Sequence, residues 1–149
     1  MTSPENVEII RKALEVFNSS DFDLDSWIDE FFDSEIEWHD LPIAPDAGVH
    51  SGREAFRSRV SAYREIWAEP TITMEDATVV GDRIVVRGRY GGIGRASGTP
   101  MTGDMSLPAT WGVYDFRAGR ILRVQQFMTH AEALEAVGLS EQDAHSDSA

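Results

Sequence analysis

The carboxylate of Asp40 is the group in this sequence best suited to acid–base chemistry. It ends the segment 35–40, where Ile36, Trp38 and Asp40 share one face of an expected short strand and His39 points the other way. Apolar neighbours raise the pKa of a carboxyl group, so we expect Asp40 to titrate in the range of a general base. The alternative is that Asp40 ends the strand at a pocket rim and accepts hydrogen bonds from loop amides.

Two arginines and a glutamine supply polar groups that could stabilise negative charge on oxygen. Arg87 and Arg89 share one face of an expected strand with Val85. Facing inward, they would form a cationic patch able to hold a carboxylate, an enolate or Asp40 itself. Facing outward, they would pair with the acidic surface. Gln126 can orient a carbonyl or a water because its amide both donates and accepts hydrogen bonds, or it is an ordinary exposed strand residue.

The histidines do not have the spacing of a metal site. They are His39, His50, His130 and His145, and no two of them stand four residues apart beside a carboxylate helper. The chain has no cysteine, which removes thiolate chemistry and Cys-based zinc sites. The sequence contains neither a Gly-x-Ser-x-Gly motif nor a phosphate-binding loop. We therefore expect no metal and no cofactor.

Length and charge narrow the class of protein. The chain has 149 residues, which suits one domain with its own core, and a net charge of −13 from 26 acidic and 13 basic residues. This acidity argues against nucleic acid and anionic membranes as partners. No basic start with an apolar stretch marks a leader, and no segment approaches the ~18 apolar residues of a membrane span. We expect a soluble, cytoplasmic protein.

Hydrophobic periodicity and capping signals predict the elements that must position these groups. The expected helices begin at Ser3, at Asp25, at a capping box over Ser51–Glu54 and at a second box over Thr129–Glu132, the last helix running through Val137. The expected strands are 35–40, 71–80, 83–90, 105–116 and 120–128, with a loop over 41–50 and a glycine-rich stretch from Gly91 to Gly103.

The order of these elements indicates the fold class. Helices that precede most of the strands favour an α+β arrangement, in which helices cover one face of a mostly antiparallel sheet. Residues 1–139 are expected to form a single domain. The polar segment 140–149 is expected to be a disordered, solvated tail.

Several local motifs, taken in order, resemble the SnoaL-like and limonene-epoxide-hydrolase-like branches of the nuclear-transport-factor-2-like superfamily. They are Trp38-His39-Asp40 before a proline-rich loop, Gly52-Arg53-Glu54-Ala55, Val85-Val86-Arg87-Gly88-Arg89, and the closing segment from Gly119-Arg120-Ile121 to Leu139. The resemblance covers nearly the whole chain. It implies a cone-shaped, curved sheet roofed by the N-terminal helices around a pocket, as in a cystatin-like roll, and a homodimer paired across the sheet.

The resemblance also implies roles for particular residues. Asp40 matches the carboxylate base of the steroid isomerases with this fold, and Arg87 and Gln126 match positions that the epoxide hydrolases use for catalysis. Essential partners of both mechanisms are missing; for the epoxide hydrolases, Arg89 and Gln126 stand where that family carries acids. In a cone fold the core and the pocket wall are one layer, so several aromatic residues are expected to contact a flat or cyclic ligand. We expect Trp38, Tyr63, Trp67 and Trp111 to do so.

Two functions from different classes fit these residues. The first is an isomerase, cyclase or hydrolase for a small apolar cyclic or carbonyl-bearing substrate, with Asp40 as base and Arg87 stabilising negative charge, and with Arg89 and Gln126 binding the substrate. The second is a ligand-binding or structural homodimer whose pocket no longer catalyses a reaction. The fold is shared by both classes, so the site must decide between them.

Overall fold

The computed structural model describes residues 3–42, 47–95, 98 and 109–139. Its elements are α1 (Ser3–Phe17), α2 (Leu24–Phe31), β1 (Phe32–His39), β2 (Val49–Ser51), α3 (Arg53–Ile66), β3 (Trp67–Val80), β4 (Arg83–Gly94), β5 (Thr110–Arg117), β6 (Arg120–Phe127) and α4 (His130–Ala136). The expected tail 140–149 and most of the stretch from Gly91 to Gly103 beyond Arg95 lie outside the described residues. None of the helices in the described part of the chain has the length and apolar character that crossing a membrane requires.

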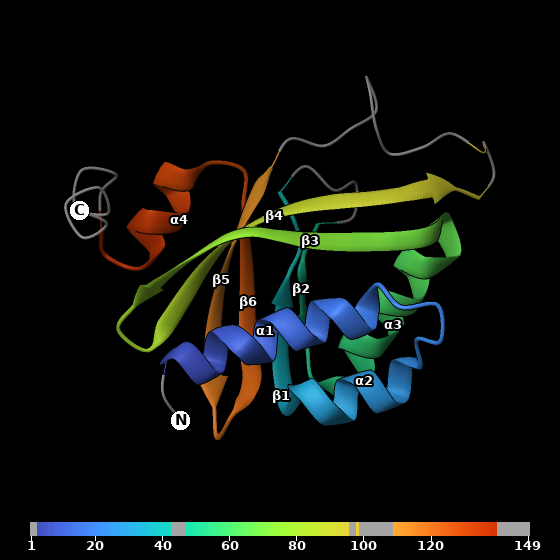
Figure 1. Cartoon of the computed structure of the whole chain (residues 1–149), viewed down its shortest axis with the longest axis horizontal. Coiled ribbons are helices and arrows are strands. Elements are labelled where there is room, and N and C mark those ends of the chain that lie inside the picture. Colours follow the sequence, from blue (N-terminus) through green and yellow to red (C-terminus); the bar gives the residue numbers. More distant parts are fainter. Residues whose placement is uncertain (1–2, 43–46, 96–97, 99–108, 140–149) are drawn as a thin grey trace.

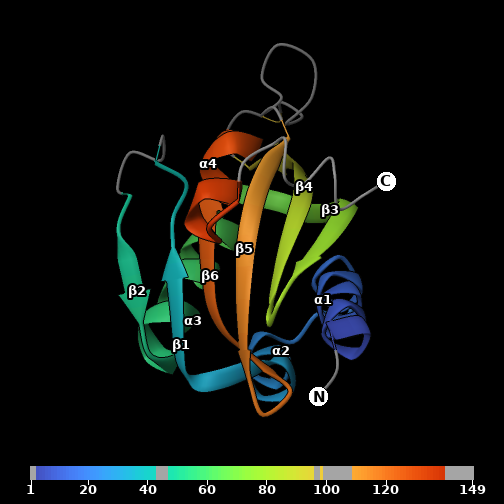
Figure 2. The same cartoon turned by 90° about the vertical axis from the view of Figure 1, so that its left-hand side faces the viewer.

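The strands form one curved sheet in the order β2-β1-β6-β5-β4-β3. Neighbouring strands are antiparallel, except that β1 and β6 run parallel. Helices α1, α2 and α3 cover the concave face, and α4 lies against the opposite face near β5 and β6 (Figures 1 and 2). The predicted α+β class and mostly antiparallel cone-shaped sheet are confirmed.

An aromatic cluster fills the layer between the helices and the concave face. Trp27 of α2, Phe32 of β1 and Phe56 of α3 are all buried, with ring centroids 4.6 to 5.9 Å apart. The indole N–H of Trp27 donates to the carbonyl of Ala13 in α1 at 2.8 Å. Because buried aromatic rings remove large apolar areas from water, this cluster fixes the three helices on the sheet.

Strand β4 has buried residues on both faces, and its alternation decides which side chains reach the interior. Val86 packs with Ile10 of α1 on the concave side. Val85 packs with Val113 of β5 and Ala133 of α4 on the convex side. The even-numbered residues of this part of β4 therefore face the helices α1 to α3, and the odd-numbered residues face away from them.

The predicted loop over 41–50 is wrong at its C-terminal end. Val49, His50 and Ser51 form the edge strand β2, which pairs antiparallel with β1 and places His50 opposite Trp38. The pairing extends into the start of α3, where the Gly52 N–H donates to the carbonyl of Ile36 at 2.7 Å. Facing residues of an antiparallel pair point to the same side of the sheet, so His50 and Trp38 share one face.

The two predicted capping boxes differ in outcome. At the start of α4, Thr129 Oγ1 accepts from the Glu132 N–H at 3.2 Å, which confirms the box there. At the start of α3, the N-cap residue is Gly52 with a φ of 90°, which makes no side-chain cap hydrogen bond, so the box over Ser51–Glu54 is wrong. Glycine is favoured at this φ because other side chains are strained there.

Candidate functional site

Asp40 follows β1, and its carboxylate is almost fully enclosed, with a side chain that is 3% exposed. Its Oδ1 accepts hydrogen bonds from Trp38 Nε1 at 3.2 Å and from Arg59 Nε at 2.9 Å. Its Oδ2 lies 2.8 Å from His50 Nε2 and accepts from the Gly48 N–H at 3.3 Å. One carboxylate therefore joins β1, β2, α3 and the loop before β2.

The pKa of Asp40 is lowered, which is the opposite of the predicted direction. Burial by itself raises the pKa of this carboxyl, as expected for a group with apolar neighbours. Hydrogen bonds from His50 and Arg59, together with their charges, lower it by more, so the pKa lies below its usual 3.8. Asp40 therefore stays ionised at neutral pH and is a weak proton acceptor. The prediction that Trp38 and Asp40 share a face is confirmed by the hydrogen bond between them.

Helix α3 contributes three side chains that meet this part of the sheet. Phe56, Arg59 and Tyr63 are spaced three and four residues apart, which puts them on one helix face. The Phe56 ring lies 5.5 Å from the Trp38 ring, and Arg59 reaches the carboxylate described above. The Tyr63 ring meets the Tyr90 ring of β4 in an edge-to-face contact, with 6.4 Å between centroids.

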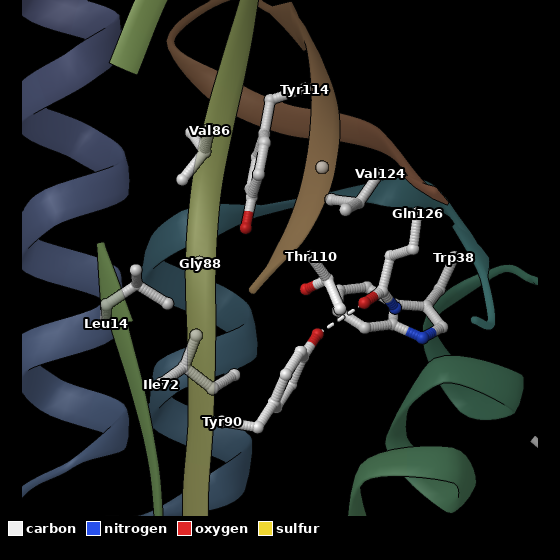
Figure 3. Close-up of a pocket in the computed structure, with 11 residues that line it drawn as sticks. Leu14, Trp38, Ile72, Val86, Gly88, Tyr90, Thr110, Tyr114, Val124 and Gln126 are labelled. Carbon is white, nitrogen blue, oxygen red and sulfur yellow. Dashed lines mark hydrogen bonds between the residues drawn. The ribbon is translucent and has the colours of Figure 1, made fainter. Parts of the chain in front are cut away.

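A small cavity lies against the concave face beside this cluster (Figure 3). Its volume is about 20 Å³, which holds about one water molecule. The described residues that line it are all uncharged. They are Leu14, Trp38, Ile72, Val86, Gly88, Tyr90, Thr110, Gly112, Tyr114, Val124 and Gln126. Trp38 connects the two parts of the site, because its ring lines the cavity and its N–H binds Asp40.

Two glycines at inward positions of β4 and β5 shape the cavity. A Cβ atom at Gly112 would lie 3.0 Å from Cε1 of Tyr114, so glycine is what leaves room for that ring. A Cβ atom at Gly88 would have only the Thr73 carbonyl oxygen within 4 Å, at 3.7 Å, among the described residues. Open space therefore remains above Gly88.

The polar groups of the cavity are neutral. Tyr90 donates its hydroxyl hydrogen to Gln126 Oε1, and Gln126 Nε2 donates to the carbonyl of His39 at 3.3 Å. The hydroxyl of Tyr114 points into the cavity (Figure 3). Burial raises the pKa of Tyr114 to about 12 and the pKa of Tyr90 well above its usual value. Both phenols therefore remain protonated hydrogen-bond donors.

Arg87 and Arg89 lie on the convex face, so the inward arrangement is wrong and the outward alternative holds. Both side chains are exposed and lie near Glu75 of β3, with Nε–carboxylate distances of 3.5 and 3.2 Å. Trp111 is on the same face: the Arg87 guanidinium lies 5.8 Å from its ring centroid, and His130 stacks on it at 5.6 Å. The structure thus separates these three predicted residues from Asp40.

The remaining predicted binding residues divide between the cavity and its surroundings. Trp38 and Gln126 line the cavity, and Tyr63 lies beside it. Trp67 is paired with Gly94 at the start of β3 and is not among the described residues that line the cavity. Trp38, Tyr63 and Gln126 are therefore the predicted binding residues that the structure brings to the site.

Sequence reasoning missed two residues, His50 and Arg59. His50 falls in the segment predicted to be a loop, and the three residues Val49, His50 and Ser51 are too short a stretch for periodicity to indicate a strand. Arg59 stands between Phe56 and Tyr63 on the apolar side of α3, where a charged residue indicates a buried partner.

His39, His50 and His130, the histidines in the described part of the chain, do not converge on a metal site; His145 lies outside it. His39 Nε2 lies 2.5 Å from Glu37 Oε1, on the side of β1 away from Asp40, as its alternation predicts. His50 contacts Asp40, and His130 stacks on Trp111. Among the residues that the structure describes, no group of three His, Asp or Glu side chains could hold a metal ion.

Comparisons with known proteins identify relatives of the chain. The family described as SnoaL-like domain matches residues 10–124. A structure of Bal32a, from a soil-derived mobile gene cassette, is 22% identical with a TM-score of 0.69, and the match covers 83% of this chain and 88% of that one. A protein from Jannaschia sp. CCS1 named as a SnoaL-like polyketide cyclase is 20% identical with a TM-score of 0.65, over 83% and 85% of the two chains. A protein from Bacillus subtilis named as an isomerase is 18% identical with a TM-score of 0.66, over 90% and 92%.

These structures share the fold of this chain, and at this level of identity they show the fold alone. None of the curated proteins matches the chain in sequence.

Replacing Arg59 by methionine is expected to raise the pKa of Asp40, because the carboxylate would stay buried while it loses the hydrogen bond and the positive charge of the guanidinium. The pKa is read from the carboxyl ¹³C shift in a pH titration by NMR. In the wild-type protein the folded pKa lies below 3.8, so the ionised carboxylate contributes stability above about pH 4, and this contribution is lost as the pH falls through the folded pKa. The variant should lose part of that contribution at neutral pH.

Arg57→Met is the matched control. Arg57 lies two residues away on the same helix and binds Asp25 at the surface at 2.7 Å. The pKa of Asp40 should be the same in Arg57→Met as in the wild-type protein. An Asp40 pKa that is the same in Arg59→Met as in the wild type would contradict the assigned role of the guanidinium.

Proposed function

Because the chain belongs to the SnoaL-like domain family, we propose that it catalyses proton transfer on a small, uncharged, cyclic carbonyl compound with its own side chains. The neighbours named as a polyketide cyclase and an isomerase support this class, since polyketide cyclisation and isomerisation beside a carbonyl group are reactions that move protons at carbon. The proposal is based on the contact between His50 and Asp40, whose other carboxylate oxygen accepts a hydrogen bond from Arg59.

In this proposal His50 accepts the proton from the substrate, and Asp40 holds the imidazole ring of His50 in position. The Asp40 carboxylate already accepts from four donors, so no position is left for a substrate proton. An N–H at Nε2 of His50 that donates to Asp40 leaves the lone pair on Nδ1 free to act as base. The side chain of His50 is 27% exposed, which leaves one side of the ring open to a substrate.

The interior suits an uncharged ring. The cavity has apolar walls from Val86, Ile72 and Leu14, and its polar groups are neutral hydroxyls and one amide. The buried carboxylate of Asp40, which contacts the cavity-lining Trp38, disfavours a second negative charge in this interior. A substrate that lies against the Trp38 ring would reach both this interior and the Asp40–His50 pair.

The size of the cavity favours a second candidate function. A space of about 20 Å³ is far below the ~300 Å³ of common ligand pockets. The alternative is a non-catalytic ligand-binding or structural protein whose interior is largely filled by side chains. For the catalytic function, the lining side chains must move apart when a substrate binds.

A deuterium-exchange assay tests the catalytic function with simple cyclic ketones in place of the natural substrate. Cyclohexanone, indanone and tetralone are incubated with the protein in D₂O, and loss of the α-proton signal is followed by ¹H NMR. We expect exchange faster than in buffer for at least one ketone. His50→Gln should slow it by about 10²- to 10⁴-fold, because the amide cannot accept the proton.

His130→Gln is the matched control, since His130 lies on the convex face beside Trp111. It should exchange the ketone at the wild-type rate. If no ketone exchanges faster than in buffer, the non-catalytic function is favoured. Equal rates in His50→Gln and wild type would exclude His50 as the base.

Gly88→Ala is expected to close the cavity without harming the fold. The added methyl group meets only the Thr73 carbonyl oxygen among the described residues, at 3.7 Å, and takes up the open space. The melting temperature should stay the same or rise. Alanine lowers the conformational entropy of the unfolded chain, which stabilises the folded state by about 0.4–1 kcal/mol. Exchange or ligand binding should fall strongly. Unaffected exchange in a stable variant would place the reaction outside the cavity.

We also propose that the protein is a homodimer, as the family resemblance implies. The convex face of the sheet carries partly exposed Trp111 and Phe127 beside the Arg87 and Arg89 side chains, and α4 covers only part of it. Equilibrium sedimentation at micromolar concentration should give about twice the chain mass of 16.6 kDa. A mass of one chain would contradict the dimer.

A further inference from the structure

The hydroxyl of Tyr63 is buried and has no hydrogen-bond partner among the described residues. Buried polar groups in folded proteins are nearly always paired, because an unpaired group loses its bonds to water without compensation. Phenylalanine would fill the same volume without this cost. A tyrosine at this position therefore indicates that the hydroxyl gains a partner in another state of the protein.

The hydroxyl is a neutral donor. Burial raises the pKa of Tyr63 to about 12, and the nearby charge of Arg64 offsets this only in part. The group therefore keeps its proton at any physiological pH. A neutral phenol donates well to an uncharged acceptor oxygen and becomes a stronger partner as that oxygen gains negative charge.

The position of Tyr63 links it to the site. It lies one turn after Arg59 on the face of α3 that meets the sheet, and its ring contacts that of Tyr90, which lines the cavity. Tyr90 already donates its hydroxyl hydrogen to Gln126. The hydroxyl of Tyr63, in contrast, donates to no acceptor in the described part of the chain.

We propose that Tyr63 is a specificity-determining residue that donates a hydrogen bond to the carbonyl oxygen of the ligand. The ligand class is thereby narrowed to rings that carry a neutral acceptor oxygen, and hydrocarbons of the same shape bind more weakly. This inference rests on the proposed function in one respect: a ligand must bind in the layer between α3 and the sheet.

The test compares two probes of nearly equal shape, indanone and indane, with wild-type protein and Tyr63→Phe. Binding is measured by ligand-observed NMR, and stability by thermal unfolding. Wild type should bind indanone about tenfold more tightly than indane, the effect of one added hydrogen bond. In Tyr63→Phe this ratio should fall to about one. The melting temperature of the variant should not fall, because the hydroxyl has no partner among the described residues to lose.

Tyr114→Phe tests a competing donor, because the hydroxyl of Tyr114 also points into the cavity. A preference for indanone that is lost in Tyr63→Phe and kept in Tyr114→Phe would support the proposal. A preference that disappears there and persists in Tyr63→Phe would overturn the proposal and assign the carbonyl to Tyr114. A preference that persists in both variants would overturn it as well, while leaving the proposed function intact.

Two further outcomes would also count against Tyr63. A marked loss of thermal stability in Tyr63→Phe would show that the hydroxyl serves the fold. If wild type binds neither probe, no ligand of this class occupies the interior, and this proposal falls together with the proposed function.

Discussion

The site depends on one buried negative charge. A carboxylate removed from water is tolerated only when charged and polar donors replace its hydration. Asp40 obtains these donors from a strand, an edge strand, a helix and a loop, through Trp38, His50, Arg59 and Gly48. The same contacts that satisfy the charge therefore fix the relative positions of four segments. This is why His50 can be held beside Asp40 although it belongs to a strand of only three residues.

Alternation along the strands separates an uncharged interior from a charged outer face. On the concave side it gathers Trp38, Tyr90 and Gln126 around a small neutral space. On the convex side it gathers Arg87 and Trp111, whose charge and stacking interactions are made near solvent. A single strand thus contributes to both faces. The uncharged interior is possible because the arginines of β4 lie on the other side.

The sequence predicts the class of fold and the pairing of Trp38 with Asp40, because both follow from local periodicity. It does not predict the side on which Arg87 lies. Strand β4 buries Ile84, Val85 and Val86 in succession, since helices cover both of its faces, and alternation alone then leaves the inward direction undecided. The contacts of His50 and Arg59 with Asp40 join residues 10 and 19 positions apart, so they depend on how a loop and a helix return to β1. Because the pKa of Asp40 depends on those contacts, the sequence does not predict its direction either.

The brevity of β2 has a consequence for how the protein responds to heat. This edge strand has a single neighbouring strand, β1, with three paired positions, whereas the central strands are held on both sides. Short edge segments open at a lower free energy than the sheet as a whole. Fraying of β2 would carry His50 away from Asp40 while the other strands stay paired. We therefore expect the contacts around Asp40 to be lost at a lower temperature than the fold as a whole.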